Sequence, residues 1–192
     1  MYYHGSKTND LKVLEPRVSN HGIARVYFSQ KRENILVYLS NAIEKYCKET
    51  GFPDQDHYTT WASYSFTKEG ILRLEEYYPN ATYDVYKGES GYIYSVKDVP
   101  NVEKQSDIPF AYHTTSSVEI DDCEFVPDAY EAIMQAVDEG KIVLQTYDEF
   151  IKVKEDWLNK IIKREYEKDD ISPDYKYFLE AKFSNIIEKN SF

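Results

Sequence analysis

The chain has 192 residues, which is enough for one domain with a hydrophobic core or for one domain with a helical appendage. Apolar residues make up 42% of it, a globular composition that excludes a disordered chain. The formal net charge is −11 at pH 7, and an acidic surface repels phosphate backbones and anionic membranes. We therefore expect neither a nucleic acid nor a membrane as a partner.

Two further features favour a reducing compartment. Cys47 and Cys123 are the only cysteines, and neither has a second cysteine or a histidine at metal-ligand spacing. Residues 1–6 lack the basic and apolar regions of a signal peptide, and no apolar run approaches the ~20 residues that span a bilayer. We expect a soluble cytoplasmic protein without a metal site.

The N-terminal part of the chain reads as short elements. Residues 1–4 favour a strand ended by Gly5, and 7–22 are rich in loop-forming residues. Strong β-formers predict a strand over 26–29. Apolar residues at i, i+3/i+4 spacing then predict one helix over 31–49.

The middle of the chain predicts a mixture of both kinds of element. Residues 54–66 are rich in aromatic and hydroxyl side chains, and 68–77 favour a short helix. Alternating residues over 82–86 and 91–96 flank a glycine-containing turn, which predicts a hairpin. Two more strands are expected, at 117–120 and 123–126.

The C-terminal part of the chain is helical in pattern. A short helix over 128–139 precedes the clearest amphipathic stripe of the sequence, at 148–167, and Pro173 opens a last helix. We expect a division near residue 140, with a mixed α/β domain over 1–140 and a helical extension over 141–192 packed on it.

The first motif with a possible chemical role is Tyr3-His4-Gly5-Ser6 at the end of the first strand. A glycine lets backbone groups approach a flat ligand closely, because no Cβ intervenes. The neighbouring imidazole can donate to a ribose hydroxyl. Alone, a motif this short is more often a turn glycine beside a surface histidine.

The second motif is Val26-Tyr27-Phe28-Ser29, followed eleven residues after Tyr27 by Tyr38. A strand followed by about three helical turns can bring both rings to one cleft, since a helix rises only ~1.5 Å per residue. Two facing rings form a slot for a flat heterocycle. Alone, the motif is more typical of a Tyr27 packed in the sheet and a Tyr38 packed on the helix face.

Together the two motifs resemble the diphtheria-toxin-like ADP-ribosyltransferases, whose best-known member is the poly-ADP-ribose polymerase catalytic domain. They are also similar to the small bacterial rifampin ADP-ribosyltransferases. The resemblance covers roughly residues 1–130. It implies an α+β ADP-ribosylation fold, with two small, mostly antiparallel sheets around a cleft for NAD, the substrate. It assigns catalytic roles to His4, Tyr27 and Glu119, and NAD-binding roles to His4, Gly5, Ser6, Tyr27, Ser29 and Tyr38.

The resemblance is incomplete at two places. The family often has a serine three residues before the second tyrosine, where this chain has Ile35. The family's acid aligns near Ser117, and Glu119 lies two residues further on, on the same strand face. The rifampin-type pattern indicates Asp98 as the acid instead. A third interpretation is that the chain has no acid in this role.

Three functions are compatible with these residues. The first is an enzyme that passes ADP-ribose from NAD to an unknown acceptor. The second is an inactive module on the same fold that binds NAD, ADP-ribose or a protein partner. The third is a tRNA 2′-phosphotransferase, which the acidic charge and few arginines disfavour.

Arg17 and Arg25, near the Tyr27 strand, are candidates to bind a pyrophosphate, because guanidinium groups match phosphate oxygens.

Overall fold

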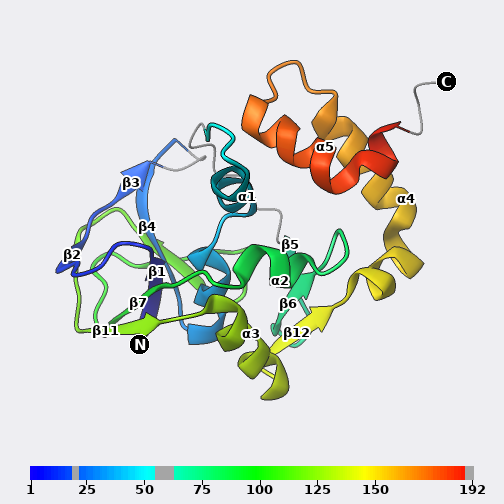
Figure 1. The fold of residues 1–192 in the computed structure, drawn as a ribbon. Coiled ribbons are helices and arrows are strands. Elements are labelled where there is room, and N and C mark those ends of the chain that lie inside the picture. The colour runs from blue at the N-terminus through cyan, green and yellow to red at the C-terminus, as the bar shows by residue number, and fades with distance from the viewer. Residues whose placement is uncertain (19–21, 55–62, 189–192) are drawn as a thin grey trace. The chain divides into compact units, whose positions relative to one another are not determined.

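The computed structural model describes residues 1–18, 22–54 and 63–188 (Figure 1). The chain has an α+β fold with several antiparallel sheets, which confirms the expected class. It divides into two compact units, each built from three separate segments. We call them the sheet unit (Met1–Leu39, Phe66–Arg73 and Tyr86–Val143) and the helical unit (Ser40–Ser65, Leu74–Val85 and Leu144–Phe192).

The sheet unit is organised around a sheet of seven strands among the described residues. The strands lie in the order β11-β7-β1-β4-β9-β8, and β3 also pairs with β4. All of these pairings are antiparallel. The strands are β1 (Tyr2–Ser6), β3 (Arg17–Val18), β4 (Ala24–Ser29), β7 (Gly91–Val96), β8 (Glu103–Lys104), β9 (Ala111–Thr114) and β11 (Asp122–Val126).

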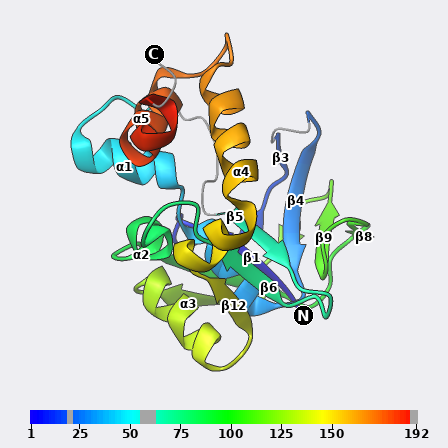
Figure 2. The same cartoon turned by 90° about the vertical axis from the view of Figure 1, so that its right-hand side faces the viewer.

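The pairing along this sheet is uneven at its centre. β1 pairs with β7 at five positions, from Tyr2 to Ser6, whereas β1 and β4 pair at Tyr3 and Ser29. β4 then pairs with β9 from Val26 to Ser29. The described part of the sheet therefore consists of two well-paired halves, β11-β7-β1 and β4-β9-β8, which a short pairing joins (Figures 1 and 2).

One face of this sheet carries a hydrophobic core. Two further short strands, β2 (Val13–Leu14) and β10 (Val118–Glu119), pair with each other. Their buried residues join those of β4 and β7 because alternate strand residues point to the same face. The core consists of Leu14, Val26, Phe28, Tyr94, Val96, Val99 and Val118.

The 3-10 helix η1 (Arg32–Leu39) packs against β1 and β7. A Cβ built on Gly5 would lie 2.8 Å from Ile35 Cγ2, and one built on Gly91 would lie 2.9 Å from Leu39 Cδ2. These two glycines permit the close approach of η1 to the sheet. Helix α3 (Ala129–Asp138), which Asp128 caps through the Glu131 N–H, contacts η1 in turn.

In the helical unit α5 contacts both α1 and α4 (Figure 2). Aromatic packing holds this unit together. Phe52 stacks on Tyr177 at a centroid distance of 4.2 Å, and Tyr77 lies 4.8 Å from Phe150. Tyr78 meets Phe183 edge-on at 5.7 Å. Such pairs add directional contacts to the buried apolar area. The helices are α1 (Ala42–Thr50), α2 (Ala81–Tyr86), α4 (Tyr147–Tyr166) and α5 (Pro173–Ile187).

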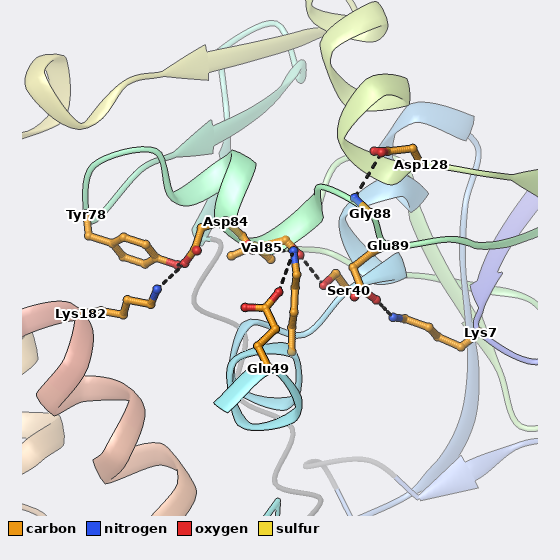
Figure 3. Close-up of polar contacts among 11 residues, drawn as sticks. Lys7, Ser40, Glu49, Tyr78, Asp84, Val85, Gly88, Glu89, Asp128 and Lys182 are labelled. Carbon is orange, nitrogen blue, oxygen red and sulfur yellow. Dashed lines mark hydrogen bonds and ion pairs between the residues drawn. The ribbon is translucent and has the colours of Figure 1, made fainter. Parts of the chain in front are cut away.

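Polar contacts converge on the end of α2 within the same unit (Figure 3). The Asp84 carboxylate accepts from Lys182 Nζ at 2.6 Å and from the Tyr78 hydroxyl at 2.8 Å. Lys45 Nζ donates to the Asp84 carbonyl at 2.7 Å, and Ser40 Oγ donates to the Val85 carbonyl at 2.7 Å. These bonds satisfy the last carbonyls of a short helix, which have no partners within it.

A further, three-stranded sheet has the order β12-β6-β5. Its strands are β5 (Ser63–Phe66), β6 (Leu72–Glu75) and β12 (Ile142–Gln145).

Several predicted elements are confirmed. The strands expected at 26–29, 91–96 and 123–126 are β4, β7 and β11, and β10 forms within 117–120. The expected helices are α3, α4 and α5. Residues 19–21 of the expected loop and 55–62 of the aromatic segment lie outside the described residues.

Other predictions about elements are wrong. The helix expected over 31–49 is divided into η1 and α1, because the Asn41 side chain accepts from the N–H groups of Ile43 and Glu44 and starts a new helix. Gly5 lies inside β1 and does not end it.

The stretches 68–77 and 82–86 exchange their expected structures. The first contains the strand β6, since Gly70 adopts a left-handed φ of 78° and turns the chain back after β5. The second is the helix α2, whose Thr82 N–H is bound by the Glu76 carboxylate.

Candidate functional site

The strongest candidate site is the imidazole of His4, which lies where the two halves of the main sheet meet. His4 Nδ1 is 2.8 Å from the backbone oxygen of Tyr27 on β4. A carbonyl oxygen only accepts, so Nδ1 carries the proton in this contact. In the neutral ring, Nε2 is then an acceptor. The sequence analysis expects His4 to donate a hydrogen bond to a ribose hydroxyl. In this tautomer, Nε2 instead accepts a hydrogen bond from such a hydroxyl.

The surroundings of His4 favour the neutral ring. Burial lowers the pKa of His4 below its ordinary value of 6.5, and the charge of Arg17 lowers it further. The hydrogen bond to the Tyr27 backbone opposes both effects. The ring packs against Phe28, with a centroid distance of 6.0 Å. The result is an uncharged acceptor with a fixed orientation at the edge of β1.

This lowered pKa predicts a pH dependence of stability. The unfolded chain binds a proton at His4 more readily than the folded chain does. The contribution of neutral His4 to the free energy of unfolding is therefore present above pH 6.5 and is lost as pH falls below it. We expect wild type to lose stability relative to His4→Asn between pH 7 and 5, because asparagine keeps a donor for Tyr27 but does not titrate. Urea unfolding at each pH measures the difference, and parallel curves for the two proteins would contradict the assignment.

Gly5 is close to η1 and is not open on its Cβ side. Ile35 Cγ2, Leu39 Cδ2 and the Ile35 carbonyl surround the position that a Cβ would occupy. The glycine is therefore explained by packing of η1 on the sheet. Ile35, which stands at the family's serine position, is one of the groups that fill this space.

The other residues assigned to NAD binding lie on β1, β4 and η1 of the sheet unit. Tyr27 is partly buried on β4 opposite His113 of β9, with their rings 6.2 Å apart. Ser29, on the same strand face as Tyr27, is buried and its Oγ accepts from the Lys31 N–H. Tyr38, on η1, is 40% exposed.

Ser6 and the candidate acids belong to the sheet unit but lie on different elements. Ser6 Oγ accepts from the Thr8 N–H at the end of β1. Glu119 is exposed on β10, opposite Val13 of β2, so the two-stranded sheet carries it. Asp98 is exposed just after β7. Both acids belong to the same unit as the imidazole.

Two cavities of the sheet unit are lined by other residues. The larger, of about 340 Å³, is lined by η1 and α3 and contains the Arg32–Glu124 ion pair. The smaller, of about 190 Å³, includes Lys31 and Phe110. Neither is lined by His4, Tyr27 or Glu119, and the mixed charge of the larger one gives it no preference for an anion or a cation.

Sequence reasoning did not place His113 at this site. The structure pairs it with Tyr27, buries it, and leaves its Nδ1 without a hydrogen-bond partner. Its Nε2 lies 3.4 Å from Glu103 Oε2. The register of β9 against β4 brings this histidine opposite Tyr27, and register is not readable from the sequence of either strand.

Comparison of the chain with protein-family models, curated proteins and solved structures found no match in any of the three. Within the described residues, no three metal-ligating side chains are grouped as an ion requires, and no helix combines the length and the apolarity that crossing a bilayer demands.

Proposed function

We propose that the sheet unit binds NAD and transfers its ADP-ribose group to an acceptor. The observation that carries this proposal is the His4–Tyr27 hydrogen bond at the short junction of β1 and β4. It holds an uncharged imidazole beside the strand that carries Tyr27. The resemblance of the His4-Gly5-Ser6 and Val26–Ser29 motifs to ADP-ribosyltransferases supplies the identity of the ligand.

In this proposal His4 Nε2 accepts a hydrogen bond from a hydroxyl of the nicotinamide ribose. A neutral acceptor suits this role, because a positive charge on His4 would disfavour the cation that develops on the ribose. The Tyr27 ring, with Tyr38 from η1, stacks on the nicotinamide. Fixed orientation of the ribose lowers the entropic part of the barrier.

The chemical step breaks the bond between the ribose carbon and the nicotinamide nitrogen. Nicotinamide leaves with the bonding electron pair, and the acceptor forms a new bond to the same carbon and loses its proton. A carboxylate stabilises the positive charge that develops on the ribose. We assign this role to Glu119, with Asp98 as the alternative, because both are exposed acids of the same unit.

One observation favours a second function, an inactive binding module. Ile35 and Leu39 occupy the space beside Gly5, where the resemblance implies a nicotinamide carboxamide. A chain with this packing binds ADP-ribose, or a protein partner, without holding nicotinamide for cleavage. Fold and activity are separable in this way in many families.

The test is release of nicotinamide from NAD by the full chain. We expect wild type to release nicotinamide and His4→Ala to lower the rate of release at least tenfold. Substrate positioning and polar contacts at a reacting centre have effects of this size. Glu119→Gln and Asp98→Asn identify the acid, since only the variant that removes the active carboxylate loses turnover.

Thermal shift separates the two functions. Stabilisation of wild type by both NAD and ADP-ribose, without nicotinamide release, would replace the enzyme by the binding module. The absence of both release and stabilisation would reject the enzyme and the nucleotide-binding module. Lys97→Gln, an exposed change after β7, is the control for general effects of surface substitution.

A further inference from the structure

Two arginines face each other across β3 and β4. Arg17 and Arg25 are direct partners in the antiparallel pairing of these strands. Like charges directly opposite each other destabilise a sheet. Although the chain has 34 acidic and 23 basic residues, no described carboxylate forms an ion pair with either guanidinium. The repulsion is therefore not compensated by the described protein groups.

The guanidinium of Arg25 also has an unmet hydrogen-bonding group. Its Nε is buried and has no hydrogen-bond partner. A buried, unpaired donor costs free energy, and more when it is charged. Arg25 lies two residues before Tyr27 on the same strand, so both side chains point to the same face. His113, opposite Tyr27, is buried with a second unpartnered atom, Nδ1.

The paired arginines are also linked to the imidazole at the junction. The charge of Arg17 is one of the causes that lower the pKa of His4, which means that the guanidinium acts on His4 through space. An anion on Arg17 would reduce this effect. Arg17 of this pair is therefore close enough to His4 to act on its charge.

We propose that Arg17 and Arg25 form a diphosphate-binding subsite of the sheet unit. A guanidinium presents planar donors that match phosphate oxygens, and two of them neutralise the two charges of a diphosphate ester. The buried Arg25 Nε gains the acceptor that it lacks. His113 Nδ1 accepts from a ligand hydroxyl, because its Nε2 proton points to Glu103. The identity of the diphosphate as part of a dinucleotide rests on the proposed function.

Calorimetric titration of the full chain with ADP-ribose, inorganic pyrophosphate and adenosine tests this subsite. We expect ADP-ribose and pyrophosphate to bind wild type, with affinity that falls as salt rises, and adenosine to bind much more weakly. Arg17→Gln and Arg25→Gln should each weaken both phosphorylated ligands at least tenfold. Lys104→Gln, an exposed residue of β8, makes the same change in net charge and should leave both affinities unchanged.

A second measurement does not depend on a dinucleotide. Without added anion, Arg17→Gln should keep or raise the Tm, because it removes one of two opposed charges from an exposed position. Pyrophosphate should raise the Tm of wild type and not that of the double variant. Equal affinities in wild type and the arginine variants, or no binding of either ligand, would overturn the subsite. Binding without nicotinamide release would keep the subsite and reject the catalytic function.

Discussion

Glu76→Ala is expected to destabilise the helical unit by about 2–5 kcal/mol, a large share of the ~5–15 kcal/mol that stabilises a typical domain. Glu76 is 7% exposed, and its two oxygens accept from the backbone N–H groups of Thr82 at 2.9 Å and Tyr147 at 3.3 Å. One carboxylate thus serves the N-termini of α2 and α4. Alanine removes the acceptor for both N–H groups and the negative charge that favours each helix start.

The matched control is Glu149→Ala, at the start of α4. Glu149 accepts from the Thr146 N–H at 3.0 Å in an exposed capping box, where water replaces the lost carboxylate. We expect a loss of about 1 kcal/mol for it. Urea unfolding followed by circular dichroism compares the two. A loss for Glu76→Ala no greater than that for Glu149→Ala would show that the buried carboxylate does not organise these helix starts.

Gly5→Ala is expected to cost about 1–3 kcal/mol, because overpacking a close contact forces neighbouring groups to move. The new Cβ would lie 2.8 Å from Ile35 Cγ2 and 3.4 Å from the Ile35 carbonyl oxygen. The side chain can adjust, but the carbonyl belongs to the backbone of η1. The expected result is a shift of η1 on β1, measured as a loss of stability in urea.

A double-mutant cycle with Ile35→Ala identifies the contact. Ile35 is 3% exposed, so Ile35→Ala alone should cost about 2–5 kcal/mol through the cavity that it leaves. In the double variant the methyl group at position 5 enters the vacated space. We expect the combined loss to fall short of the sum by about 1–2 kcal/mol, whereas strictly additive losses would mean that Gly5 is required for another reason.

The sequence predicted helices and strands well where the hydrophobic pattern agrees with the residues that start or end an element. α3 begins after the capping Asp128, and α5 begins at Pro173, so both starts are readable. The errors arise where tertiary contacts decide the structure. Tyr83 and Val85 alternate with polar residues as strand residues do, but Glu76 caps the segment as a helix. That carboxylate lies outside the segment itself, so no local pattern reveals its role.

The candidate site was predictable only in part, for a similar reason. The motifs brought attention to His4 and Tyr27, which the structure joins by a hydrogen bond. The acceptor is a backbone carbonyl, which residue identity does not encode. The opposition of Arg17 and Arg25 depends on register, because a one-residue slip would place the two side chains on opposite faces. Register is set by pairing across the sheet and is not readable from either strand alone.

The interleaved segments of the helical unit have a practical consequence for work on this protein. Tyr77 and Tyr78 come from the middle of the chain, but their ring partners Phe150, Trp157 and Phe183 all follow residue 140. An expression boundary at that residue would leave aromatic side chains without their packing partners, and such a fragment should aggregate or be cut rapidly in limited proteolysis. Ligand assays therefore require the intact polypeptide.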